Sequence, residues 1–238
     1  MPRGAGLVGG PRLLTLRTGH PHSTISKVLR RHGLSRPARA AREPVRRYEW
    51  PCPGDLLHAD WTRYARFARP GHAVTGDRSS TAADKRARVG YDFAHALVDD
   101  NSRLGYAELL PDCRAVTVTG FTERALAFFR SNGITARRLM TDNHLSYIRN
   151  RSLRDLLAAQ GIRHFTTPAR RPQVNGKVER FHQTMAREWA YGVRYRSSRH
   201  RAAALPHWLR YYNERRPHSS LGGQPPISRV HNVCGQDS

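Results

Sequence analysis

Three acidic residues lie at positions where strand and helix patterns predict well-placed carboxylates. Asp60 lies within a short apolar strand, Asp142 ends a second strand, and Glu179 lies near the start of a long helix. Mg²⁺ prefers oxygen ligands and keeps several waters, so a few carboxylates can hold it. Two such ions about 4 Å apart activate the attacking oxygen and stabilise the leaving oxygen of a phosphoryl transfer. Asp60, Asp142 and Glu179 are therefore candidate catalytic and metal-binding residues.

Each acid also has an ordinary structural interpretation. An aspartate at the end of a strand, such as Asp142, is more often a turn or cap residue. A glutamate in the first turn, such as Glu179, is favoured by the helix dipole. Asp60 is the least ordinary of the three, because an acid inside an apolar strand costs free energy unless a cation or a partner neutralises it.

The elements that would position these acids follow from hydrophobic period and turn residues. A strand is predicted at 56–61, with His58 and Asp60 on one face. Strands at 89–98 and 104–110 form an antiparallel hairpin around the turn 99–102. The remaining predicted elements are a helix at 121–129, a strand at 138–141, a helix at 153–159, a strand at 162–165 and a helix at 176–191. This order predicts an α/β fold, a mixed five-stranded sheet flanked by helices.

The long helix at 176–191 has two distinct faces. Its apolar stripe consists of Val178, Phe181, Met185 and Trp189. A second set of residues is expected to face another way, namely Glu179, His182, Gln183 and Ala186.

The N-terminal part predicts a small basic module. Residues 11–35 form two short helices around a Gly-His-Pro turn, with Ser23 as N-cap and Gly33 as the end of the second helix. The exposed side of that helix carries Lys27, Arg30 and Arg31. A helix–turn–helix with a basic second helix is typical of DNA binding, although any short basic amphipathic hairpin looks similar.

Composition favours a polyanionic partner. The chain has 238 residues, with 41 Lys and Arg against 18 Asp and Glu, a formal net charge of +23. Such a surface repels itself when compact and is suited to binding phosphates, so nucleic acid is the expected partner. A ribosome-like scaffold or a codon bias toward arginine are the alternative explanations. We expect four regions: the helix–turn–helix segment at 1–35, a basic linker at 36–54 that tracks phosphates or is a solvated spacer, the catalytic core at 55–192, and a helical extension and tail at 193–238.

Other compartments and site classes are not favoured. No run of about 18 apolar residues is present, and the N-terminus is too polar for a secretory signal, so no membrane partner is expected. The three cysteines, Cys52, Cys113 and Cys234, are far apart and lack CxxC spacing. We therefore expect neither a zinc site nor a disulfide framework, and a reducing cytoplasm as the compartment.

Several blocks of the sequence, in order, resemble one known family. The strongest are GDLLHADW at 54–61, RLMTDNHLSY at 138–147 and RRPQVNGKVERFHQTMAREWAY at 170–191. HALVDDNSRLGYAELL at 95–110, WLRYYNERRPHSSLGGQPPISRV at 208–230 and STISKVLRRHGLSRP at 23–37 complete the set. Together they resemble the insertion-sequence 481-type transposases with an integrase catalytic core, within the retroviral-integrase superfamily. No single block would be specific.

The resemblance implies an RNase H-like fold and a bacterial, nucleoid-associated enzyme that transfers DNA strands at the ends of a mobile element. It implies Asp60, Asp142 and Glu179 as the catalytic triad holding two Mg²⁺ ions, with Mn²⁺ as a substitute. Double-stranded DNA, both element ends and target, would be the partner, and a homo-oligomer would form in synapsis. His58, Asn143 and Gly176 would shape the site. DNA would be bound by Lys27, Arg30, Arg31, Arg170, Arg171, Asn175 and Lys177. Near the C-terminus, structural or phosphate-contacting roles are expected for Asn213, Arg216 and His218.

Besides a mild change in the QTNGK pattern, which reads QVNGK at 173–177, three departures from the family pattern bear on activity. His144 stands where the family usually has glycine, and it would be strained if that position requires φ > 0. Between Asp142 and Glu179 lie 36 residues, one more than is usual. The chain also starts partway into the family's DNA-binding region. These departures leave open a truncated, inactive relict that only binds DNA. An RNase H-like nuclease acting on RNA hybrids is a weaker alternative, because the helix–turn–helix and the C-terminal block favour DNA.

Overall fold

The computed structural model describes residues 11–34, 48–70, 75–76, 89–168 and 172–230. The chain divides into two compact units, Met1–Tyr48 and Glu49–Ser238. The predicted linker at 36–54 falls across this division: residues 36–47 lie outside the described ranges, and residues 49–54 belong to the larger unit. The C-terminal extension belongs to the larger unit as well.

The smaller unit contains the two predicted helices, α1 (Pro11–Thr18) and α2 (His22–Arg31). The cap of α2 differs from the prediction, because Pro21 rather than Ser23 is the N-cap and makes no side-chain cap bond. Gly33 follows α2 at φ 69°, which is the left-handed conformation that ends many helices. Within these two helices only Ile25 is buried, and Leu16 is 83% exposed.

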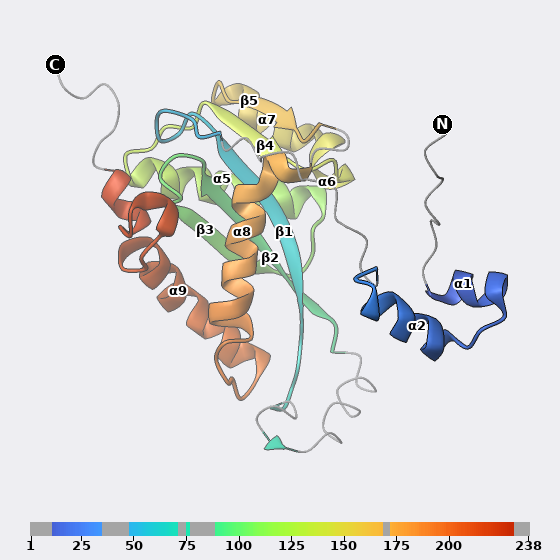
Figure 1. Cartoon of the computed structure of the whole chain (residues 1–238). Helices are drawn as coiled ribbons and strands as arrows, with labels where there is room; N and C mark the ends of the chain where they lie inside the picture. Colours follow the sequence, from blue (N-terminus) through green and yellow to red (C-terminus); the bar gives the residue numbers. More distant parts are fainter. Residues whose placement is uncertain (1–10, 35–47, 71–74, 77–88, 169–171, 231–238) are drawn as a thin grey trace, which may run out of the picture. The chain divides into compact units, whose positions relative to one another are not determined.

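The larger unit is built on the mixed five-stranded sheet that the sequence predicts. Its strands are β1 (Leu57–Ala65), β2 (Tyr91–Asp99), β3 (Gly105–Leu110), β4 (Arg138–Thr141) and β5 (Arg163–Thr166), in the spatial order β3-β2-β1-β4-β5. β1, β2 and β3 pair antiparallel, whereas β4 pairs parallel with both β1 and β5. This is the RNase H-like arrangement, and Figure 1 shows β1 running the length of the sheet.

Helices cover both faces of this sheet (Figure 1). The bounds of those between β3 and β5 are α5 (Ala115–Ser131), α6 (Leu145–Ile148) and α7 (Arg151–Ala159). After β5 come the 3₁₀ turn η1 (Pro172–Asn175), α8 (Gly176–Met185), a π-helical turn η2 (Ala186–Ala190), α9 (Ser198–Glu214) and the 3₁₀ turns η3 (Ser219–Leu221) and η4 (Pro226–Arg229). The sequence predicted 176–191 as one helix, and the structure changes its hydrogen-bonding pattern at Ala186.

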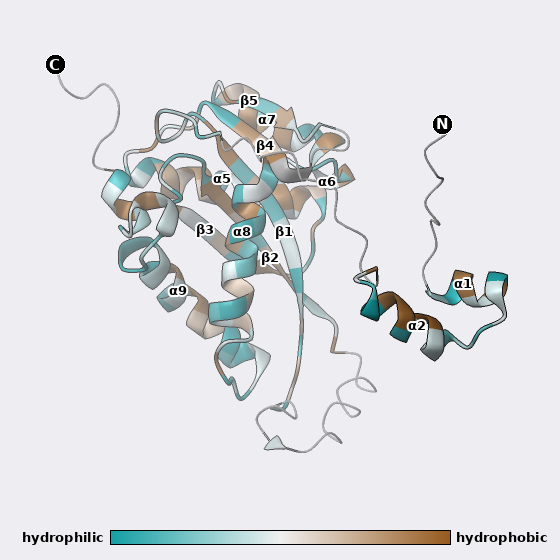
Figure 2. Cartoon of the chain, in the orientation of Figure 1, coloured by the Kyte–Doolittle hydropathy of each residue, from teal (hydrophilic) through white to brown (hydrophobic). Residues whose placement is uncertain are grey.

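The alternation of side chains along β1 divides the core in two. Leu57 and Ala59 face a cluster formed with α5 and α7, which includes Phe121, Phe129 and Leu153. Tyr64 faces the opposite cluster, formed mainly with α8 and α9. Figure 2 shows the hydrophobic residues gathered on the sides of the helices that meet the sheet. The acid-bearing face of β1 is therefore the face that α8 covers.

Three expectations about local structure are corrected. α5 begins at Ala115 rather than 121, and β1 continues to Ala65 rather than ending at 61, because its pairing with β2 extends to Ala65 and Tyr91. His182 was expected to face another way than the apolar stripe of α8, together with Glu179, yet only 8% of it is exposed. The buried side of α8 therefore extends beyond its apolar stripe. α9 packs on α8 through contacts of Phe181 with Trp208 and Tyr212.

Cys52 is disulfide-bonded, although no disulfide framework was expected from the sequence. Cys113 is a free thiol and is partly buried. Within the described ranges, every helix is too short or too polar to cross a lipid bilayer.

Candidate active site

Asp60 lies in the middle of β1, opposite Ala96 of β2. Its side chain is partly buried and lies on the same strand face as His58 and Tyr64. One carboxylate oxygen, Oδ1, accepts a hydrogen bond of 2.7 Å from the backbone N–H of Trp61. The antiparallel ladder on the β2 side thus holds the first acid rigidly in the sheet.

Burial raises the pKa of Asp60 to about 7, although the bond from the Trp61 N–H opposes this effect. The negative charges of Asp142 and Glu179 raise the pKa of Asp60 further. Residues 60, 142 and 179 are distant in sequence, but in the fold the charges of Asp142 and Glu179 act on Asp60. Like charges gathered in this way are characteristic of sites that bind a cation or hold a proton.

Asp142 directly follows β4, beside the region where β1 and β4 separate. The register between these strands pairs Leu57 with Leu139 and His58 with Met140, and both acids lie two residues beyond the last pair. Oδ1 of Asp142 accepts a 3.0 Å bond from the backbone N–H of His144. The two aspartates therefore lie at the fork between parallel strands, a typical place for ligands in such sheets.

The residues after Asp142 adopt an unstrained conformation. His144 has φ −65° and ψ 142°, and its ring accepts a bond from the Ser146 N–H as the N-cap of α6. The histidine in place of the usual glycine therefore causes no left-handed strain. The exposed Asn143 donates its side-chain amide to the Thr167 carbonyl at 2.8 Å, which ties this loop to the chain after β5.

Two residues near the acids were not expected from the sequence. Tyr147 of α6 is 1% exposed, and its hydroxyl has no hydrogen-bond partner among the described residues. Burial and the charges of Asp60 and Asp142 raise the pKa of Tyr147 well above its usual value. Burial lowers the pKa of His182 to about 4, an effect that the neighbouring Asp60 backbone opposes. Both lie on short or regular elements whose sequence gives no sign of proximity to Asp60.

Glu179 lies in the first turn of α8 and is exposed. The start of this helix is held against β1 by Asn175, which is 3% exposed. Asn175 contacts His58 through an Oδ1 to Nδ1 distance of 3.1 Å and donates to the Ala59 carbonyl at 3.4 Å. Farther along, the Tyr64 hydroxyl donates to the His182 carbonyl at 3.5 Å. α8 therefore runs in the same direction as β1.

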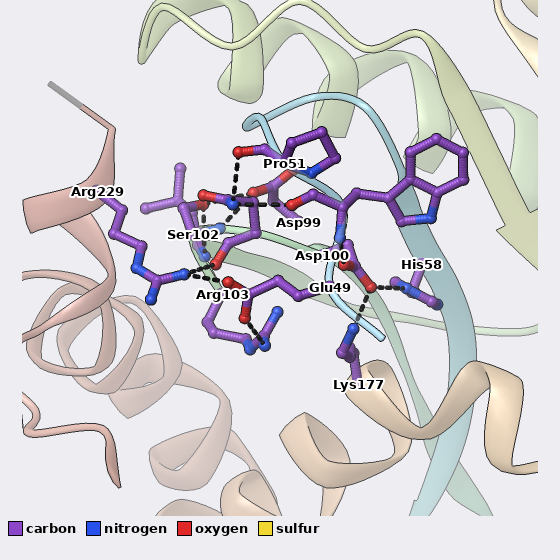
Figure 3. A network of polar contacts seen from close by, with 12 residues as sticks. Glu49, Pro51, His58, Asp99, Asp100, Ser102, Arg103, Lys177 and Arg229 are labelled. Carbon is purple, nitrogen blue, oxygen red and sulfur yellow. Dashed lines mark hydrogen bonds and ion pairs between the residues drawn. The ribbon is translucent and has the colours of Figure 1, made fainter. Parts of the chain in front are cut away.

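A buried carboxylate, Asp100, connects this helix start to the rest of the site (Figure 3). Its Oδ1 accepts from His58 Nε2 at 2.8 Å and pairs with the ammonium group of Lys177. Its Oδ2 accepts from the Trp50 backbone N–H at 2.8 Å. Burial alone would raise the pKa of Asp100, but these hydrogen bonds outweigh it and lower the pKa to about 2.

The residues predicted to bind DNA have different environments. Lys27, Arg30 and Arg31 are exposed on α2, whereas Arg170 and Arg171 lie outside the described residues. Asn175 is buried against His58, and Lys177 turns its ammonium group toward Asp100. Gly176 begins α8 with open space where a Cβ would be.

The C-terminal residues expected to be structural make structural contacts. Asn213 bonds the backbone of Gly105, and Arg216 forms a bidentate ion pair with Glu188 of the π-helical turn. His218 is 9% exposed, and its ring lies edge-on 4.8 Å from the ring of Tyr212. These contacts fix α9 and the segment after it on the face of the sheet that carries Asp60.

As the side chains stand, no three His, Cys, Asp or Glu residues in the described ranges are arranged to hold a metal ion. At the candidate site, Asp60 and Asp142 each direct one carboxylate oxygen to a nearby backbone N–H. The donor chemistry of the three acids suits a hard cation, since all are carboxylates, and burial together with the like charges of its neighbours raises the pKa of Asp60.

Comparisons of sequence support an integrase relationship. Residues 160–226, which include Glu179, match the family described as integrase core domain. The putative integrase ORF3 of Spiroplasma virus SpV1-C74 is 28% identical over 167 residues, which cover 65% of this chain and 45% of that protein. The chain thus matches less than half the length of this relative. The similarities support the retroviral integrase superfamily.

Comparisons of structure show the fold of an integrase catalytic core. The catalytic core domain of BIV integrase has a TM-score of 0.51 at 21% identity, over 75% of this chain and 95% of that one. A chain of the simian T-cell lymphotropic virus intasome with PP2A regulatory subunit B56 gamma has a TM-score of 0.58 at 16% identity, over 94% and 71%. The HTLV-2 integrase catalytic core domain in complex with magnesium has a TM-score of 0.52 at 13% identity, over 76% and 99%.

Proposed function

We propose that this chain is a transposase of the insertion-sequence 481 type, a polynucleotidyl transferase that joins DNA strands. The observation that carries this proposal is the position of Asp60 and Asp142, each two residues beyond the last β1–β4 pair, with Glu179 on α8, the helix that covers this face of an integrase-core fold. The match of residues 160–226 to the integrase core domain supports it independently. The formal charge of +23 suits a DNA substrate, because each neutralised phosphate releases counterions.

Asp60, Asp142 and Glu179 are the residues that would hold Mg²⁺, with Mn²⁺ as a substitute. When bound, a pair of such ions supplies Lewis-acid activation of the attacking oxygen and stabilisation of the leaving oxygen. Asp60 and Asp142 each direct only Oδ1 to a backbone N–H, so the second carboxylate oxygen of each can serve as a ligand. The HTLV-2 integrase core, a protein of the same fold, is in complex with magnesium.

The chain's own residues would position DNA for two successive displacements at phosphorus. In the first, water breaks one phosphodiester at an element end and leaves a 3′-hydroxyl. In the second, that hydroxyl replaces the 3′-oxygen of a target phosphodiester, so one phosphodiester is exchanged for another. A duplex at the fork between β1 and β4 would meet Asp60 on a rigid strand, Asp142 on a loop and Glu179 on α8. Exposed basic side chains such as Arg163 suit phosphate contacts.

Joining two element ends to one target calls for more than one copy of the chain, and we include a homo-oligomer in the proposal. HTLV-2 integrase cores have been solved in trimeric and dimeric forms, and a simian T-cell lymphotropic virus intasome is among the structural neighbours.

The direct test is strand transfer by purified full-length protein with element-end DNA, a target plasmid and Mg²⁺. Asp142→Ala should abolish joined product, since loss of a metal-binding carboxylate in such sites removes turnover. Asp155→Ala is a matched control, because it removes one exposed carboxylate from α7 and gives a protein with the same net charge as Asp142→Ala. Equal joining by wild type and Asp142→Ala would end the assignment.

A second candidate function is a relict that binds DNA without catalysis. It is favoured by the absence, among the described side chains, of a group arranged to hold a metal. Isothermal titration with Mn²⁺, with and without element-end DNA, separates the two functions. DNA affinity with neither metal binding nor cleavage would establish the relict.

A further inference from the structure

We propose that Asp100 is a positioning residue for the candidate active site: it fixes the start of α8 on β1 and thereby places Glu179 beside Asp60. The inference rests on the proposed function only for the catalytic role of Glu179. Asp100 itself is 0% exposed and acts through Lys177 and His58 rather than on substrate.

Three separate segments converge on this one carboxylate. His58 belongs to β1, Lys177 to the first turn of α8, and Trp50 to the segment preceding β1. A buried carboxylate without partners would be costly, whereas one with several charge-assisted hydrogen bonds holds its partners firmly. The turn between β2 and β3 brings Asp100 to these three partners. In this turn the neighbouring Asp99 accepts hydrogen bonds from the N–H groups of Gly54 and Ser102.

The contacts of this network set the register between α8 and β1. His58 bonds Asn175, and Tyr64 bonds His182 farther along both elements. The Asp60–Glu179 pair lies between these two contacts on both elements. Asp60 is two residues beyond His58, a rise of about 6.7 Å along a strand. Glu179 is four residues beyond Asn175, a rise of about 6 Å along a helix. These two rises are similar. The contact between His58 and Asn175 therefore places Glu179 at about the same height along β1 as Asp60.

Lys177 has an alternative role, which is contact with a DNA phosphate. The structure favours the positioning role, because its side chain is only 17% exposed and its ammonium group pairs with the fully buried Asp100. Mispositioning of a metal-binding group by about 1 Å is sufficient to lower turnover strongly. The two roles therefore predict different results for the same substitution.

The test compares Asp100→Asn, Lys177→Met and Lys177→Arg in the full-length chain, with Arg180→Met as the control for loss of an exposed cation on the same helix. The first readout needs no activity: hydrogen exchange at the amides of residues 180–183, which close the first turn of α8. Asp100→Asn and Lys177→Met should accelerate this exchange roughly 10-fold, Lys177→Arg less, and Arg180→Met not at all.

The second readout is strand transfer. Both Asp100→Asn and Lys177→Met should lower turnover roughly 10- to 100-fold and raise the Mg²⁺ concentration for half-maximal rate, with DNA affinity unchanged. In a variant that combines Asp100→Asn and Lys177→Met, the loss of turnover should equal that of either single variant, because both substitutions break the same network. Lys177→Arg should recover part of the rate.

Wild-type exchange rates in Asp100→Asn and Lys177→Met would overturn the inference. So would a Lys177→Met variant that keeps wild-type exchange and turnover but binds DNA more weakly with a reduced salt dependence, since Lys177 would then be a phosphate contact. If wild-type protein joins no DNA under any condition, the proposed function fails, whereas accelerated exchange in the variants would still establish the positioning of α8 by Asp100.

Discussion

Asn213 on α9 bonds both backbone polar groups of Gly105, the first residue of β3. Its Oδ1 accepts from the Gly105 N–H at 2.9 Å, and its Nδ2 donates to the Gly105 carbonyl at 2.8 Å. β3 is an outer strand of the sheet, and an outer strand presents N–H and C=O groups without a strand partner. Asn213 supplies that partner and anchors α9 to the sheet edge.

Replacing Asn213 with alanine should destabilise the larger unit by roughly 2–4 kcal/mol, because two buried backbone groups lose their partner. Urea unfolding followed by circular dichroism measures this change. Glu214→Ala, an exposed neighbour on the same helix, should change stability by less than about 0.5 kcal/mol. Equal stability of the two variants would show that water replaces Asn213 at no cost.

Gly105 should not tolerate a side chain. A Cβ at this position would lie 2.5 Å from Cε2 of Phe181, a buried residue of α8. We expect Gly105→Ala to destabilise the fold by about 1–3 kcal/mol through overpacking. Gly120→Ala in α5 is the control with the opposite sign, since its Cβ would meet only the end of the flexible Arg124 at 3.3 Å and alanine favours a helix. Thermal unfolding of both variants checks the pair.

Because of the network around Asp100, the free energy of unfolding should depend on pH under acidic conditions. Burial acts to raise the pKa of Asp100, but the hydrogen bonds from His58, Lys177 and Trp50 lower it from 3.8 to about 2. Since the folded-state pKa lies below the unfolded one, the ionised carboxylate stabilises the fold above about pH 4, and this contribution disappears as the pH falls toward 2.

Wild type should therefore exceed Asp100→Asn in unfolding free energy at pH 5, and roughly 2 kcal/mol of that difference should vanish by pH 2. Urea unfolding of both proteins at pH 5, 4, 3 and 2 measures it. A difference that stays constant over this range would contradict the assigned partners.

His144 should stabilise the fold more than the glycine that is usual at this position in the resembled family. Its ring accepts from the Ser146 N–H and lies 5.1 Å from the Trp61 ring, edge-on, at φ −65°. His144→Gly should lower stability by about 1 kcal/mol, through loss of the ring contact and added freedom of the unfolded chain. Differential scanning calorimetry gives the change. Increased stability in the variant would reveal strain at this residue.

The basic side chains of α2 should contribute to DNA affinity without sequence preference. Lys27, Arg30 and Arg31 are all exposed. Substituting all three with alanine should reduce the slope of log K against log salt by up to about 3, since each phosphate contact contributes about 0.9. Fluorescence anisotropy with labelled duplex at several salt concentrations measures the slope. An unchanged slope would exclude α2 from the DNA interface.

The sheet and its connections could be predicted from the sequence because they depend on short-range patterns. The strand at 138–141 and the apolar stripe Val178, Phe181, Met185 and Trp189 are confirmed. The predicted pair of helices in the N-terminal unit is also confirmed. Period and turn residues act over a few positions, which is the range that a single sequence reveals.

The parts that could not be predicted depend on contacts between distant residues. The partners of Asp100 are 42, 50 and 77 positions away, and its role is invisible in a turn sequence that would serve equally well at the surface. Tyr147 and His182 near Asp60 were missed for the same reason. The convergence of Asp60, Asp142 and Glu179 was a hypothesis from resemblance, and the coupling of their charges supports it without placing a metal ion.

The fork between β1 and β4 gives the two aspartates unequal freedom. Asp60 belongs to a strand paired with β2 from Leu57 to Ala65, whereas Asp142 lies beyond the last paired residue of β4, Thr141. Asp60 is thus held in place by the strand, whereas the position of Asp142 can change with the loop that follows β4. The loop at 142–144 would therefore set the distance between the two carboxylates when a phosphate binds. Substitutions in that loop would change this distance without disturbing the sheet.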